Sequence, residues 1–184
     1  GIKSRRTDLV EKSQQFSHED FYAREQQSQS VVCLFGKERS SDMLVELGVS
    51  LADDEGIVEV ASIIEVPEQT TLRDVVEVPA EVRSIRRRVR MIAKEKEANI
   101  QFDPIVSHDL SKSVFEISRC VHCKWLLVEW RGRSRGALTV HNPIGWLKSH
   151  LHCHLGIFKD AGVRYVQRIL VYLNDDSNDG TVLE

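Results

Sequence analysis

The residues that most invite chemistry lie in a basic, glycine-containing segment after an apolar run. Residues 125–128 are apolar without alternation, which predicts a strand covered on both faces. Glycines let a backbone approach a ligand closely, and arginines offer charge to an anion. Ligands of open α/β sheets bind beyond the carboxyl ends of strands, so this pattern predicts an anion or nucleotide site. The candidate binding residues, with two from the end of an earlier strand, are Gly36, Lys37, Arg131, Gly132, Arg133, Gly136 and Gly145.

The same segment has a simpler interpretation, as a solvated loop that only makes turns. A second charged segment, the arginine-rich run at 83–90, is interleaved with acidic residues and has apolar positions at helical spacing. A solvated helix face is the interpretation we favour for it, and an acidic partner or a lipid surface is the alternative.

Two short clusters of cysteine and histidine have spacings found among metal ligands. They span residues 120–123 and 150–154. Each lies at the end of an expected helix, and the two helices end at the same edge of the sheet. The candidate ligands are Cys120, Cys123, His152 and Cys153. Helix ends often carry histidine, and small cysteines pack well, so we expect structural packing and no bound metal. A metal or thiol-redox module stays open as an alternative.

Ser107, His108 and Asp109 have the residue types of a hydrolytic triad but are consecutive. Consecutive side chains point in different directions and cannot relay a proton as a triad does. Asp109 is better explained as the N-cap of the helix that follows. No other segment pairs a nucleophile with a base, so we expect a protein that is not an enzyme.

Composition limits the function classes. The chain has 184 residues, 41% of them hydrophobic, and a net charge of −3, which argues against a nucleic-acid binder. No apolar run reaches the roughly 20 residues of a membrane span, and no secretory signal is visible. The four cysteines lack the spacing of a secreted disulfide framework, so we expect a reducing, cytosolic setting.

Strand and helix patterns alternate along the chain, which predicts a doubly wound α/β fold: a mostly parallel, five-stranded sheet with helices on both faces. We expect strands at 31–35, 57–66, 100–106, 125–128 and 155–158, and helices at 40–51, 79–99, 110–121 and 143–151. An extra strand is expected at 168–173. The predicted organisation is a polar linker at 1–29, the domain at 30–162, and an extra strand with an acidic tail at 163–184.

These residues resemble a universal stress protein domain over positions 30–162. The features that carry the resemblance are Val31–Phe35, Ile63-Ile-Glu-Val-Pro67, Val106-Ser-His-Asp109 and Leu126-Leu-Val-Glu-Trp-Arg-Gly132. The Trp-Arg-Gly form is similar to domains fused to the cytosolic end of amino-acid permeases and cation or chloride carriers. The basic residues at 3–6 resemble a segment that follows a last membrane helix.

The resemblance implies a site for ATP, held by a G-x2-G-x9-G-[ST] motif, but this chain departs from that motif. If Gly132 takes the second glycine position, Glu129 takes the first, and the loop to Gly145 is too long. Trp146 stands where Ser or Thr is expected. A carboxylate repels phosphate, most strongly in a desolvated pocket, so we expect weak or no ATP binding. No cofactor is required; the ligand left open is ATP, AMP, a cyclic nucleotide or another anion.

The function that the sequence favours is a cytosolic regulatory and dimerisation domain of a membrane transporter, tethered to the membrane as part of a longer chain. Its partners would be a second copy, paired through residues 168–173 across a two-fold axis, and the membrane domain of the parent transporter. Alternatively, residues 168–173 open a second repeat. A free-standing, ATP-binding universal stress protein is the other functional alternative.

Overall fold

The computed structural model describes residues 21, 27–35, 41–72, 75, 77–129 and 143–158. Five strands form one sheet in the order β3-β2-β1-β4-β5, and every neighbouring pair is parallel. The strands are β1 (Ser30–Leu34), β2 (Ile57–Glu65), β3 (Asn99–Ser107), β4 (Trp125–Glu129) and β5 (His154–Phe158). The predicted doubly wound α/β class is therefore confirmed. The extra strand expected at 168–173 lies outside the described residues.

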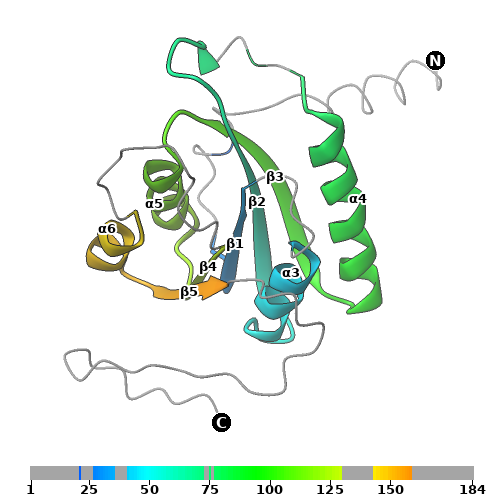
Figure 1. The fold of residues 1–184 in the computed structure, drawn as a ribbon. Coiled ribbons are helices and arrows are strands. Elements are labelled where there is room, and N and C mark those ends of the chain that lie inside the picture. The colour runs from blue at the N-terminus through cyan, green and yellow to red at the C-terminus, as the bar shows by residue number, and fades with distance from the viewer. Residues whose placement is uncertain are drawn as a thin grey trace.

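Four helices connect these strands and cover both faces of the sheet (Figure 1). They are α3 (Ser41–Ser50), α4 (Ala80–Glu95), α5 (Leu110–Val121) and α6 (Pro143–His150). Helices α3 and α4 pack in one apolar cluster with one face of the sheet, and α5 and α6 pack in a second cluster with the other face. The strands β1 and β4 and most of β2 are thus buried on both sides, as the centre of a parallel sheet requires, whereas the edge strands β3 and β5 are partly exposed.

The alternation of side chains along β1 shows how the sequence supplies both cores. Val31 and Cys33 belong to the cluster under α5 and α6, whereas Val32 and Leu34 belong to the cluster under α3 and α4. All four are fully buried. Successive residues of a strand point to opposite faces, so an unbroken apolar run is what a strand between two helical layers needs.

The buried faces of the helices are those that the spacing of apolar residues predicts. Helix α4 buries Val82, Ile85, Val89 and Ile92, which recur at helical spacing, and leaves Arg87 and Arg90 exposed. It ends at Glu95, four residues earlier than the expected helix at 79–99. Glu97 adopts a left-handed conformation with φ 51°, and Asn99 already pairs with Ile57 in the sheet. The sheet therefore ends a helix that the local sequence would extend.

The segment before β1 also joins the fold. Phe21 is buried in the core under α5 and α6, although it lies within the expected polar linker. The backbone N–H of Gln29 donates to the carbonyl of Ile57, and that of Ser28 donates to the carbonyl of Val121. Among the described helices, none is both long and apolar enough to cross a membrane.

Candidate functional site

The carboxyl edge of the sheet contains the point at which the order of the strands reverses. From the central pair β1 and β4, the chain leaves on opposite sides: α3 follows β1 onto one face, and α6 follows β4 onto the other. In doubly wound sheets, helices that follow two neighbouring strands onto opposite faces define a crevice beyond the carboxyl ends of those strands. In a doubly wound sheet this crevice is where ligands bind, so the topology marks it as the candidate site.

Glu129 is the described side chain that most affects the character of this edge. It is the last residue of β4, is 5% exposed, and aligns with Phe158 of β5. Leu127 lies in the cluster under α3 and α4, and alternation places Glu129 on the same face. A buried carboxylate at the end of β4 would repel a polyphosphate placed beside it.

Gly145 and Trp146 lie in the first half of α6. The carbonyl of Gly145 accepts a hydrogen bond of 3.2 Å from the Ser149 hydroxyl, one turn later in the helix. Trp146 stacks on His150 at 4.4 Å and meets the Phe115 ring edge-on at 5.4 Å. Where the resemblance expects a phosphate-binding hydroxyl, this chain has an aromatic side chain that packs between α6 and α5.

The other candidate anion-binding residues lie outside the described part of the chain. These are Gly36, Lys37, Arg131, Gly132, Arg133 and Gly136. The structure therefore places the elements that lead into and out of the predicted site, and the prediction for these six residues stays a prediction.

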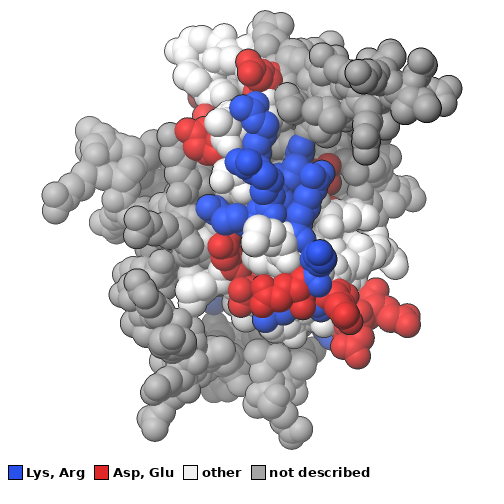
Figure 2. Space-filling model, turned by 90° about the vertical axis from the view of Figure 1, so that its right-hand side faces the viewer, with Lys and Arg blue, Asp and Glu red and all other residues white. Residues whose placement is uncertain are grey.

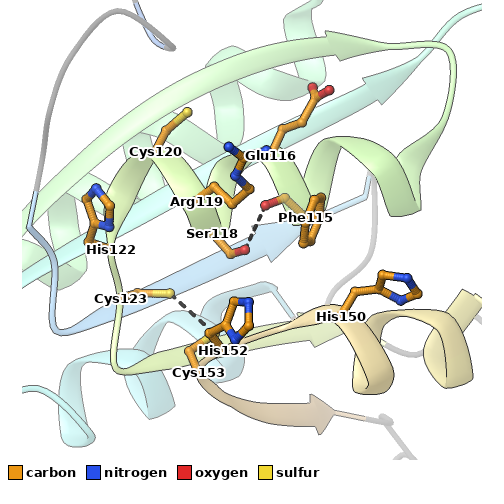
Figure 3. Close-up of a pocket in the computed structure, with 10 residues that line it drawn as sticks. All are labelled: Phe115, Glu116, Ser118, Arg119, Cys120, His122, Cys123, His150, His152 and Cys153. Atoms are coloured by element: carbon orange, nitrogen blue, oxygen red, sulfur yellow. Dashed lines mark hydrogen bonds between the residues drawn. The ribbon is translucent and has the colours of Figure 1, made fainter.

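The opposite edge of the sheet has a groove between the end of α5 and the end of α6 (Figure 3). Its volume is about 840 Å³, and its lining includes Phe115, Arg119, Cys123, His150, His152 and Cys153. The guanidinium of Arg119 lies over the Phe115 ring at 5.8 Å. We did not predict that Phe115 and Arg119 take part, because their position in the groove depends on how α5 is rotated against α6.

The groove brings together two of the four candidate metal ligands. The Cys123 thiol donates a hydrogen bond of 3.8 Å to the Cys153 sulfur. The thiol of Cys120 points away from this pair, and His152 is exposed at the surface (Figure 3). Within the described ranges, no three His, Cys, Asp or Glu side chains gather in a way that would hold a metal ion. What the two clusters form together is a dithiol.

The hydrogen bond makes the two thiols unequal. It lowers the pKa of Cys153, whose sulfur accepts it, and with burial it raises the pKa of Cys123, which donates it. Cys153 is therefore the sulfur that ionises first. Cys33 lies beneath them on β1 and is fully buried, and burial raises its pKa well above the ordinary value.

The junction of β3 and α5 confirms the expected role of Asp109. Its carboxylate accepts a hydrogen bond of 3.1 Å from the backbone N–H of Lys112, and thereby caps α5. The Ser113 hydroxyl donates a hydrogen bond of 2.6 Å to the Ser107 hydroxyl, and a ring nitrogen of His108 lies 3.3 Å from the Val66 carbonyl. These contacts join β2, β3 and α5, and they do not align the three residues as a triad.

The outer side of α4 presents a band of basic side chains above a row of acidic ones (Figure 2). Several of the arginines contact other parts of the chain. Arg88 pairs with Asp42 of α3 at 3.1 Å, Arg86 lies 5.4 Å from the centre of the Phe102 ring, and Arg83 donates to the Val78 carbonyl. These contacts agree with a solvated helix face.

Comparisons with known proteins show the fold. The chain matches no protein-family model, and no curated protein matches it in sequence. A universal stress protein from Archaeoglobus fulgidus superposes with a TM-score of 0.51 at 14% identity, over 71% of this chain and 97% of that one. A universal stress protein in complex with cAMP gives 0.47 at 14% identity, over 72% and 98% of the two chains. A universal stress protein from Archaeoglobus fulgidus in complex with dAMP gives 0.47 at 10% identity, over 71% and 96% of the two chains. The match with a TM-score of 0.51, together with the five-stranded parallel sheet, shows that the chain has the fold of universal stress proteins.

Proposed function

We propose that this domain is a non-enzymatic, universal-stress-type regulatory module that binds a small anion of the nucleotide class at the carboxyl edge of β1 and β4. The observation that carries the proposal is the reversal of strand order at this edge, with α3 and α6 leaving to opposite faces. The arginine-rich sequence after β4 supplies the charge that an anion needs.

The ligand we favour carries little phosphate charge. Glu129 is buried at the end of β4 and Trp146 packs on α5 and His150. Neither suits a triphosphate, so a nucleoside monophosphate or a cyclic nucleotide fits this edge better than ATP does.

Isothermal titration with ATP, AMP and cAMP tests the proposal. We expect weak or no binding of ATP, and a measurable affinity for AMP or cAMP. Charge reversal at Arg131 or Arg133 should weaken that binding by about tenfold to a hundredfold, because charged hydrogen bonds contribute roughly 1.5–3 kcal/mol each. Arg90→Glu, an exposed charge reversal on α4, is the matched control and should leave the affinity unchanged. Low-micromolar ATP affinity, or no binding of any of the three, would contradict the proposal.

We propose further that the module serves a membrane transporter on its cytosolic side and acts as a homodimer. The basic sequence at 3–6 and the Trp-Arg-Gly sequence at 130–132 support the first part, and the apolar run at 169–173 supports the second. Light scattering should give twice the mass of one chain, and Val171→Lys should shift it toward a monomer. A monomer at high concentration, unchanged by that substitution, would remove the dimer. Hydrophobic spans upstream in the parent reading frame would support the transporter, and their absence would argue against it.

A further inference from the structure

We propose that Cys123 and Cys153 form a redox site, at which a small hydroperoxide converts the two thiols into a reversible intramolecular disulfide. The site lies in the groove between α5 and α6, at the edge of the sheet opposite the proposed anion site. The proposed redox site depends only on the geometry of this groove, at the amino ends of the strands. It does not depend on what binds at the carboxyl edge.

The backbone holds the two residues at a separation that a disulfide can span. Cys123 precedes β4 by two residues and Cys153 precedes β5 by one, and the N–H of His154 donates to the Lys124 carbonyl at 3.0 Å. Cys153 and Cys123 thus lie on neighbouring parallel segments of the chain, offset from each other by one residue. Strand spacing of about 4.8 Å and a rise of about 3.3 Å per residue give a Cα separation near 6 Å, which lies within the ~4.4–6.8 Å range of disulfides.

The sulfurs already face each other. They are 3.8 Å apart, and a bond of about 2.05 Å needs rotation of the side chains rather than a change of strand register. Both residues are half-buried and line a groove that opens to solvent, so a small oxidant can reach them.

The other two described thiols show why this pair is selective. Cys33 is completely buried on β1, out of reach of an oxidant. Cys120 is half-buried one residue before the end of α5, but its thiol points away from the pair (Figure 3). Reactive cysteines combine access with thiolate character, and the hydrogen bond from Cys123 lowers the pKa of Cys153.

The chemistry takes two steps. The Cys153 thiolate attacks one oxygen of hydrogen peroxide, the O–O bond breaks, and hydroxide leaves with the displaced electron pair, which gives a sulfenic acid at Cys153. The Cys123 sulfur then attacks the Cys153 sulfur, the S–O bond breaks, and the hydroxyl leaves as water after taking the proton from Cys123. The two sulfurs lose two electrons in total, one peroxide is reduced to two waters, and a cellular thiol reverses the change by exchange. Disulfides of reducing compartments are typically transient and redox-sensing.

The first test uses the full chain treated with hydrogen peroxide, followed by digestion without reductant and peptide mass spectrometry. We expect one dominant disulfide, between Cys123 and Cys153, within a single chain and reversed by dithiothreitol. Cys120→Ser should leave it unchanged, whereas Cys123→Ser should leave a sulfenic acid at Cys153 that dimedone traps. Pairing that involves Cys120 to the same extent, or no disulfide at all, would overturn the proposal.

A second test needs no variant, so it holds even if a substituted chain fails to fold. The rate of iodoacetamide alkylation is measured peptide by peptide on the wild-type protein as the pH rises. Because the pKa of Cys153 is lowered and that of Cys120 is raised by burial, Cys153 should become reactive at a lower pH than Cys120. If Cys120 reacts at the lower pH, Cys153 is not the nucleophile.

Discussion

Gly48 is the position at which a single added methyl group should disturb the packing of α3 on the sheet. A Cβ atom there would lie 2.5 Å from the Cγ2 atom of Val32, and 3.5 Å from atoms of Ser30 and Val58. Val32 is fully buried in the centre of β1, and β-branched side chains have few alternative rotamers. The Gly48 carbonyl also accepts a 2.7 Å hydrogen bond from the Ser30 hydroxyl, which fixes the helix against the strand. We therefore expect Gly48→Ala to destabilise the fold.

The expected change in the free energy of unfolding of Gly48→Ala is the sum of two opposing effects. Alanine favours the helix over glycine by about 1 kcal/mol, whereas overpacking a core costs about 1–3 kcal/mol. Since the contact is well inside van der Waals distance and the partner is rigid, the upper part of that range applies, and the net loss should be about 1–2 kcal/mol. Val32→Ala alone should cost about 2–3 kcal/mol through lost burial and a cavity.

The double variant separates this explanation from a general weakening of α3. In Gly48→Ala with Val32→Ala, the new methyl group enters the space that Val32 Cγ2 vacates, so the overpacking term disappears and the helix gain remains. We expect a total loss of about 1–2 kcal/mol rather than the additive ~3–5 kcal/mol, a coupling of about 2 kcal/mol. Urea unfolding followed by circular dichroism measures all four proteins, with Glu46→Ala on the exposed face of α3 as the control. Additive losses, or a Gly48→Ala protein as stable as wild type, would refute the reasoning.

Three further outcomes can be measured by the same unfolding assay. The disulfide between Cys123 and Cys153, which are 30 positions apart, should raise the free energy of unfolding by about 3–4 kcal/mol; equal midpoints for oxidised and reduced protein would show that strain cancels the gain. His122→Gly should stabilise the protein by roughly 0.5–1 kcal/mol, because His122 ends α5 with φ 47° and ψ 57°, whereas His122→Ala should give no gain. Asp109→Ala should cost about 1 kcal/mol by removing the cap of α5, and Asp109→Asn should cost much less; equal losses would mean that the carboxylate charge matters more than the cap.

The sequence predicted those parts of the fold that depend on local pattern. The unbroken apolar run at 31–34 predicts a strand buried on both faces. The helical spacing of Val82, Ile85 and Val89 predicts the buried face of α4. These patterns give the order of strands and helices along the chain. Because strands and helices alternate, that order predicts a parallel sheet. The predicted end of α4 was wrong because residues 96–99 are compatible with a helix. Only the pairing of Asn99 with Ile57 in the sheet overrides that preference.

The groove between the ends of α5 and α6 depends on contacts that the local sequence pattern does not predict. The sequence indicated that the two cysteine and histidine clusters share an edge, but not which members meet. Cys123 meets Cys153 because His122 turns the chain out of α5 in a left-handed conformation, while Cys120 stays on the helix. The stacking of Trp146 on His150 and Phe115 likewise depends on the rotation of α6 against α5, which no spacing within one helix determines.

The two proposed sites share two elements, and this makes coupling between them a measurable quantity. Strand β4 connects the Cys123 turn to Glu129, and α6 connects the carboxyl edge to the turn that holds Cys153. A disulfide would tie the turn after α6 to the turn after α5, while the first residues of α6 follow the proposed anion site in the chain. If oxidation changes the affinity for AMP or cAMP by some factor, the nucleotide must change the equilibrium of disulfide formation by the same factor. Titration of the oxidised and reduced protein, and redox equilibration with and without nucleotide, should therefore give equal factors. Equal factors above or below one would show that the sites are coupled, unequal factors would mean that one of the two measurements had not reached equilibrium, and a factor of one in both would make the sites independent.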